Sequence, residues 1–188
     1  MKLTVDLKSF FLLPNLISSF RLILGFIIGL LFWSNPNLES LRPILVFSIL
    51  IAYFSDILDG FLARKLKIVT ELGKIIDPVA DKFFIFVLVL ILFLSGELEQ
   101  WLFISIIGRD FLIIFGSYFF TSKRSFVIPS NYLGKFTVFF IGIYLLLLFL
   151  KIDTSDFVSN LFQFCIFGLL VFSLVKYFFD ALLILKRG

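Results

Sequence analysis

Residues 74–95 read KIIDPVADKFFIFVLVLILFLS, and they decide how the rest of the chain is interpreted. From Phe83 to Leu94 every residue is apolar, whereas Asp77, Asp81 and Lys82 are confined to one end. An α-helix needs about 20 mainly apolar residues to cross a bilayer. The stretch therefore predicts a membrane-spanning helix with its ionisable residues gathered near one membrane face.

Five further stretches outside this one are long and apolar enough to span a membrane: 16–34, 41–63, 99–121, 134–151 and 157–182. The composition agrees, because 61% of the 188 residues are hydrophobic and 16% are charged, against roughly 45–50% and about 25% in soluble domains. We expect an all-α polytopic membrane protein with six transmembrane helices, forming one domain over residues 1–188. Residues 1–15 predict a short amphipathic helix at the membrane interface.

The distribution of Lys and Arg predicts the orientation of these spans. With the N-terminus in the cytoplasm, the outer loops hold only Arg42 and Lys151. The cytoplasmic side then holds the remaining basic loop residues: Lys2, Lys8, Arg64, Lys65, Lys67, Lys74, Lys123, Arg124, Lys135, Lys186 and Arg187. The positive-inside rule thus predicts an inner-membrane protein with both termini in the cytoplasm. The net charge of +4 is too modest to indicate nucleic-acid binding.

Four carboxylates stand out where the second predicted span ends and the third begins. Asp56 and Asp59 share one helical face, and Asp77 and Asp81 share another, so a short link brings both pairs together. Charged residues inside spans are costly and usually functional. The chain has no His and a single Cys165, so acid–base or metal chemistry must come from carboxylates.

Converging carboxylates require compensating cations, and an all-oxygen ligand set favours Mg²⁺ or Mn²⁺. A two-ion cluster of this kind suits displacement at phosphorus, and one carboxylate could accept a proton from the attacking hydroxyl. Two other interpretations stay open: a structural ion pair with Lys82 or Arg64, or the ion site of a membrane cation transporter. The basic loop with Arg64 beside the carboxylates favours an anionic nucleotide over transport.

The residues DILDGFLAR (56–64) and GKIIDPVAD (73–81), eight residues apart, resemble the signature of the CDP-alcohol phosphatidyltransferases at every defining position. The resemblance implies six spans, a homodimer and an active site open to the cytoplasm. It implies that Asp81 is the general base and that CMP is the leaving group. The implied metal ligands are Asp56, Asp59, Asp77 and Asp81. The implied CDP contacts are Asp56, Gly60, Ala63 and Arg64, with Gly73 on the same helical face as Asp77.

The acceptor is indicated by weaker signals. The segments around Gly108-Arg109-Asp110 and Gly134-Lys135 resemble those of bacterial phosphatidylglycerophosphate synthases. This implies CDP-diacylglycerol as donor and glycerol 3-phosphate as acceptor, with Arg109 and Lys135 receiving its phosphate. Two departures are Asp110 in place of Glu and Thr137 in place of a second Lys.

The alternatives for the acceptor are phosphatidylglycerol, as in cardiolipin synthases of the same family, inositol phosphate or serine. Arg109 could instead pair with Asp110, and Lys135 could be an ordinary loop cation. Arg21 lies one turn inside the first span, where exposure to lipid is unfavourable. We expect it to pair with a site carboxylate or with substrate phosphate at the acceptor site.

Overall fold

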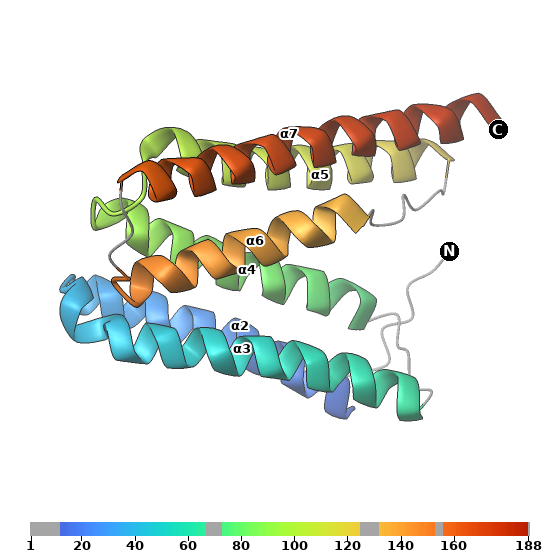
Figure 1. The fold of residues 1–188 in the computed structure, drawn as a ribbon. Helices are drawn as coiled ribbons and strands as arrows, with labels where there is room; N and C mark the ends of the chain where they lie inside the picture. Colours follow the sequence, from blue (N-terminus) through green and yellow to red (C-terminus); the bar gives the residue numbers. More distant parts are fainter. Residues whose placement is uncertain (1–11, 67–72, 125–131, 153–155, 188) are drawn as a thin grey trace. The chain divides into compact units, whose positions relative to one another are not determined.

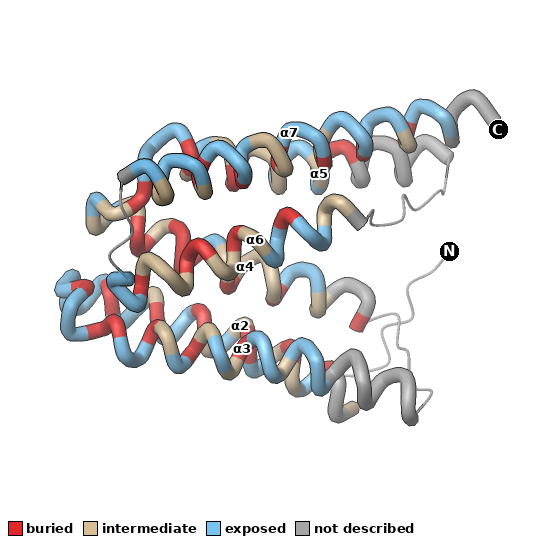
Figure 2. The backbone as a smooth tube through the Cα atoms, in the orientation of Figure 1, coloured by how far each residue is buried: buried red, intermediate tan, exposed pale blue. Residues whose placement is uncertain are grey.

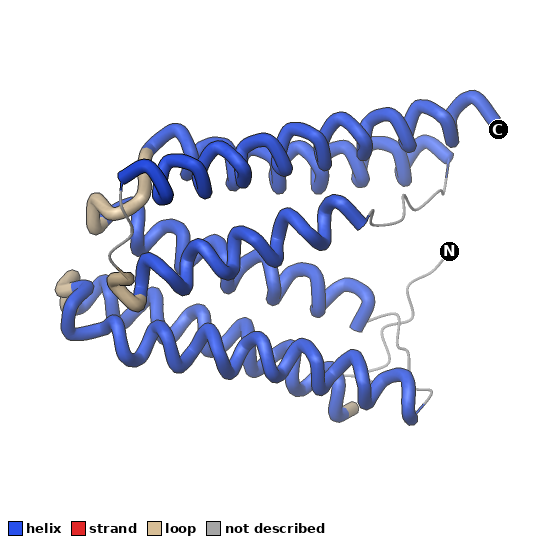
Figure 3. Tube along the Cα trace, in the orientation of Figure 1, coloured by secondary structure: helices blue, strands red, loops and turns tan. Residues whose placement is uncertain are grey.

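The structure, a computed structural model, describes residues 12–66, 73–124, 132–152 and 156–187. These residues form six helices (Figure 1): α2 (Leu13–Ser34), α3 (Leu38–Leu66), α4 (Gly73–Leu94), α5 (Gln100–Arg124), α6 (Tyr132–Phe149) and α7 (Asp156–Arg187). Within those ranges the rest is short loop, without a strand (Figure 3). The all-α prediction is confirmed. The predicted interfacial helix at residues 1–15 falls largely outside the described residues.

The six helices match the six predicted stretches to within a few residues, because the breaks contain residues that end helices. Helix α2 stops at Ser34 ahead of Asn35, which is extended and directly precedes Pro36, as expected before a proline. Gly96, just after α4, has φ +75°, a conformation that glycine adopts without strain. The last helix extends five residues beyond the predicted end at 182.

Three helical segments in the described part are long and apolar enough to cross a membrane: Asn15–Ser34, Leu38–Leu58 and Phe157–Leu183, with a shorter apolar helix at Leu133–Phe149. Many large apolar side chains on these helices are exposed, including Phe47, Phe164 and Phe172. Figure 2 shows exposed stretches along each of these helices. Such surfaces are unfavourable in water and suited to lipid. The chain is an integral membrane protein, and the count of six spans remains a prediction.

The contacts divide the chain into two compact units, residues 1–95 and 96–188. In the first unit, α2 packs against both α3 and α4. Gly25 permits the close approach of α2 to α4, because a Cβ there would lie 3.3 Å from the Phe83 ring and 3.5 Å from the Phe84 Cα. The buried face of α2 therefore brings its polar residues close to the helices that carry the carboxylates.

In the second unit, α7 packs against both α5 and α6. The Tyr177 hydroxyl donates a hydrogen bond to the Ile113 carbonyl of α5 at 3.3 Å. On the other side, the wholly buried Thr137 hydroxyl of α6 donates to the Leu169 carbonyl at 3.3 Å. The division into two units does not decide whether they form one domain, so the single domain over residues 1–188 stays a prediction.

Candidate active site

All four predicted carboxylates belong to the first unit, and the structure describes the side chains of three of them. Asp56 belongs to α3, and Asp77 and Asp81 lie one turn apart on α4. Gly73 is buried and forms the first residue of α4. The other predicted residues, Asp59, Gly60, Ala63 and Arg64, also belong to α3, but nothing beyond their backbone is described.

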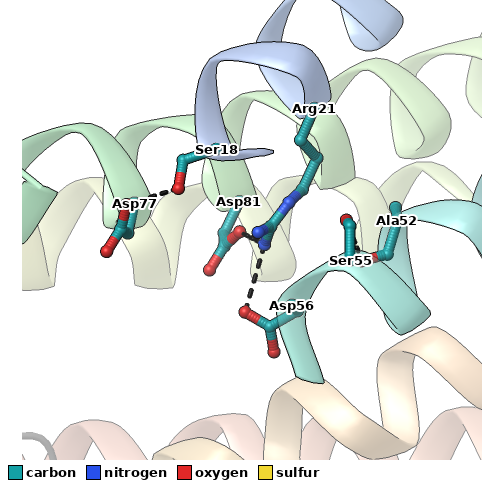
Figure 4. A network of polar contacts seen from close by, with 7 residues as sticks. All are labelled: Ser18, Arg21, Ala52, Ser55, Asp56, Asp77 and Asp81. Carbon is teal, nitrogen blue, oxygen red and sulfur yellow. Dashed lines mark hydrogen bonds and ion pairs between the residues drawn. The ribbon is translucent and has the colours of Figure 1, made fainter. Parts of the chain in front are cut away.

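Arg21 of α2 links the two carboxylate-bearing helices. Its Nη1 donates to Asp56 Oδ1 of α3 at 3.1 Å and also to Asp81 Oδ1 of α4 (Figure 4). The Arg21 side chain is only 4% exposed, whereas those of Asp56 and Asp81 are 61% and 39% exposed. The buried cation thus lies behind two carboxylates that remain open on their outer side. Arg21 therefore pairs with two site carboxylates, one of the two roles predicted for it, and its role at the acceptor site stays a prediction.

Ser18, one turn before Arg21 on α2, contacts the third carboxylate. Its hydroxyl donates to Asp77 Oδ1 at 2.5 Å, and the side chain is fully buried (Figure 4). Ser18 is not among the residues predicted from the sequence. The available signal was the spacing of Asn15, Ser18 and Arg21, which recur every three residues among mainly apolar neighbours. All three are buried.

The donor chemistry of this site fits hard divalent ions. Asp56, Asp77 and Asp81 offer only oxygen, and two of them are open enough for an ion to enter. Among the described residues, however, no three acidic side chains converge as a ready ligand set. Asp56 and Asp81 are held through Arg21, and Asp77 is held separately by Ser18. The predicted metal role of these residues therefore remains a proposal.

The two residues expected to bind the acceptor phosphate, Arg109 and Lys135, belong to the second unit. The Arg109 Nη1 donates to Asp110 Oδ1 at 2.6 Å, and its Nε donates to Ser173 Oγ of α7 at 3.3 Å. The pairing with Asp110, which was the alternative to acceptor binding, is therefore present. Lys135 is exposed near the start of α6. The acceptor role of both residues remains a prediction.

Thr137, which departs from the pattern of the phosphatidylglycerophosphate synthases, is a packing residue in this chain. It is fully buried, and its hydroxyl donates to the Leu133 carbonyl at 2.7 Å and to the Leu169 carbonyl at 3.3 Å. The position therefore joins α6 to α7 through a hydroxyl in place of presenting a second cation.

The sequence of this chain is similar to those of known proteins over most of its length. A relative from Aquifex aeolicus (strain VF5), named CDP-diacylglycerol–glycerol-3-phosphate 3-phosphatidyltransferase, is 39% identical over 135 residues, covering 71% of this chain and 72% of the relative. A protein of the same name from Rickettsia typhi (strain ATCC VR-144 / Wilmington) is 31% identical over 127 residues, covering 68% and 70%. One from Bacillus subtilis (strain 168) is 37% identical over 86 residues, covering 46% and 44%.

The profile of one family, described as CDP-alcohol phosphatidyltransferase, matches residues 11–177. The match includes all of the carboxylates, the polar face of α2 and both Arg109 and Lys135. It therefore covers every residue that the sequence and the structure select for the site. The chain belongs to the CDP-alcohol phosphatidyltransferase family.

Proposed function

We propose that this protein transfers the phosphatidyl group of CDP-diacylglycerol to glycerol 3-phosphate, giving phosphatidylglycerophosphate and CMP. The family match over residues 11–177 supports a transferase, and the names of the relatives support this donor and acceptor. The structural observation that carries the proposal is the approach of Asp56 and Asp81, from two different helices, to a single nitrogen of Arg21. This puts carboxylates from both halves of the signature at one site.

Asp56, Asp59, Asp77 and Asp81 are the residues that would hold divalent metal, as two Mg²⁺ or Mn²⁺ ions in keeping with their all-oxygen chemistry. Bound there, such ions would supply Lewis-acid polarisation of the phosphate and charge stabilisation of the leaving CMP. The described carboxylates support this role because they are partly exposed and come from two helices that both contact Arg21 or Ser18 of α2.

The remaining chemistry belongs to the side chains. The acceptor hydroxyl oxygen attacks the phosphorus of the phosphatidyl group, its proton passes to the Asp81 carboxylate, and a new P–O bond forms. The P–O bond to CMP breaks, and CMP leaves with the electron pair. Asp81 suits the role of base because it lies on α4, one turn from Asp77 and close to Asp56 through Arg21.

Substrate binding is assigned to two groups of residues. The CDP moiety would contact residues of the signature: Asp56, Gly60, Ala63, Arg64 and Gly73. The acceptor phosphate would be bound by Arg109 as a planar fork and by Lys135 as a point charge. Arg109 is supported in this role by its hydrogen bonds from Nε to Ser173 of α7 and from Nη1 to Asp110, which leave Nη2 of the guanidinium outside these two contacts.

We further propose that the protein resides in the inner membrane as a homodimer, with both termini and the active site facing the cytoplasm. The orientation is supported by the excess of Lys and Arg on one set of loops. The cytoplasmic active site is supported by the position of Asp77 and Asp81 near the start of α4, next to the most basic predicted loop. The dimer is supported by the family resemblance.

The decisive experiment is CMP release by the purified protein in detergent with Mg²⁺ or Mn²⁺ and CDP-diacylglycerol. Glycerol 3-phosphate, phosphatidylglycerol, inositol phosphate and serine are supplied as separate acceptors. Release with glycerol 3-phosphate alone is the expected result. Release with phosphatidylglycerol alone would keep the chemistry and reassign the reaction to cardiolipin synthesis, and release with none would contradict the proposed activity.

A further inference from the structure

The face of α2 that meets the carboxylates is polar only along its first half. Asn15, Ser18 and Arg21 are 2%, 0% and 3% exposed, and the same stripe continues through the buried Ile28 and Phe32 as an apolar face. A buried cation in a membrane helix is stable only with an anionic partner. Arg21 therefore belongs to the site, and its partners show what it does there.

One nitrogen of Arg21 contacts two carboxylates from two helices. Nη1 donates to Oδ1 of Asp56 and to Oδ1 of Asp81 (Figure 4). Because Arg is the buried member and both Asp side chains are partly exposed, the guanidinium reaches the carboxylates from inside the unit. A metal ion arriving from the exposed side would meet carboxylates that already share a positive charge.

The described carboxylates are also divided between two partners. Asp56 and Asp81 contact Arg21, Asp77 contacts Ser18, and no three acidic side chains among the described residues converge. A divalent ion binds best where several carboxylates converge and no other cation occupies their oxygens. The contacts of Arg21 oppose both conditions, through occupied oxygen atoms and through charge repulsion.

We propose that Arg21 competes with divalent metal for Asp56 and Asp81. Arg21 neutralises the two carboxylates when metal is scarce and gives up at least one of them when metal binds. This inference rests on the proposed metal role of the carboxylates, and it makes Arg21 a charge-compensating residue of the metal site in addition to any contact with substrate phosphate. Replacing Arg21 by a neutral residue should therefore increase metal affinity.

The test is Mn²⁺ binding to the full-length protein in detergent, without either substrate, followed by electron paramagnetic resonance. We expect Arg21→Gln to bind Mn²⁺ about tenfold more tightly than wild type, since a unit charge about 5 Å from a divalent ion changes its binding by about this factor even at the dielectric constant of water. Arg42→Gln is the matched control. Arg42 is also a buried arginine of the first unit, but it pairs with Glu39 of its own helix, so its variant should bind like wild type.

The outcomes separate this inference from the proposed function. Equal or weaker Mn²⁺ binding by Arg21→Gln, with normal binding by wild type, would overturn the competition and leave the metal site standing. Absence of Mn²⁺ binding from wild type, in a preparation that releases CMP, would contradict the metal site and the competition together. Arg21→Lys keeps a positive charge and should restore an affinity close to that of wild type.

A second measurement does not depend on the folding of Arg21→Gln. In wild type labelled with ¹⁵N-arginine, the Arg21 side-chain signal can be assigned by its absence from Arg21→Lys. Titration with Mg²⁺ should shift this signal and accelerate exchange of its N–H protons, because hydrogen bonds to Asp56 or Asp81 are lost. An Arg21 signal that does not change at saturating Mg²⁺ would overturn the proposal.

Discussion

The hydroxyl of Ser18 in α2 donates a 2.5 Å hydrogen bond to Oδ1 of Asp77 in α4, 59 residues further along the chain. This bond fixes one oxygen of a candidate metal ligand from a neighbouring helix. Residues that orient ligands in this way typically change metal affinity or activity by about 10–100-fold when they are replaced. Ser18→Ala should therefore lower Mn²⁺ affinity and CMP release by about tenfold, as measured by titration and by turnover.

The neighbouring Ser19 provides a matched control for that prediction. Its hydroxyl donates to the Asn15 carbonyl of its own helix at 2.8 Å, so Ser19→Ala removes a hydroxyl without touching Asp77. It should retain wild-type affinity and turnover. Replacement of Ser18 removes a hydrogen bond that orients Asp77 and should weaken metal binding. Replacement of Arg21 removes a competing positive charge and should strengthen it. Equal effects at positions 18 and 19 would show that the bond to Asp77 is unimportant.

Asp81→Asn should abolish phosphatidyl transfer while the protein stays folded. The amide cannot accept the proton of the acceptor hydroxyl, and loss of a positioned base typically costs about 10²–10⁴-fold in rate. The measurement is CMP release, accompanied by thermal unfolding in the same detergent. Glu99→Gln, at an exposed acidic residue of the second unit, is the control and should keep full activity. Turnover by Asp81→Asn within a few-fold of wild type would rule out its role as base.

Ser173→Ala should raise the KM for glycerol 3-phosphate by about fivefold, with little change in kcat. Ser173 is fully buried and accepts the hydrogen bond from Arg109 Nε, and a hydrogen bond of this kind contributes about 1 kcal/mol. Ser105→Ala is the control, because Ser105 donates only to the Trp101 carbonyl of its own helix. An unchanged KM in Ser173→Ala would argue against an acceptor site that depends on the orientation of Arg109.

Gly25→Ala should be less stable than Gly29→Ala, although both replace a glycine of α2 by the same residue. A Cβ at Gly25 would lie 3.3 Å from the Phe83 ring and close to the α4 backbone, whereas one at Gly29 would lie 3.7 Å from Val87, an ordinary contact. Overpacking typically costs about 1–3 kcal/mol. Thermal unfolding in detergent should show a lower midpoint for Gly25→Ala, and equal midpoints would contradict the close approach of α2 and α4.

The orientation in the membrane can be tested with the single Cys165 replaced by Ala. Single cysteines are then introduced at Asn37 and at Lys186, and intact cells are treated with a membrane-impermeant maleimide. Asn37→Cys should react from outside, and Lys186→Cys should react only after the membrane is opened. Labelling in the reverse pattern would invert the orientation predicted from the basic loops.

The positions of the helices followed from the sequence alone. Runs such as Phe83–Leu94 leave no alternative to a helix in lipid, because the backbone must satisfy its hydrogen bonds within its own segment. The polar breaks at 34–37, 95–99 and 150–156 then set the helix ends to within a few residues. The same local logic located Asp56 in the second half of α3 and Asp77 and Asp81 in the first half of α4, since spacing along a helix determines which side chains share a face.

The partners of those carboxylates were decided by tertiary structure. The sequence left Arg21 with two possible roles, and it gave Ser18 none, because hydroxyls in membrane helices are commonly satisfied by their own backbone, as Ser55 is by the Ala52 carbonyl. Ser18 and Arg21 act on residues 35 to 60 positions away, and periodicity carries no information over such separations. Only the packing of α2 against both α3 and α4, with Gly25 allowing the close approach to α4, brings Asp56, Asp77 and Asp81 into contact with one face of α2.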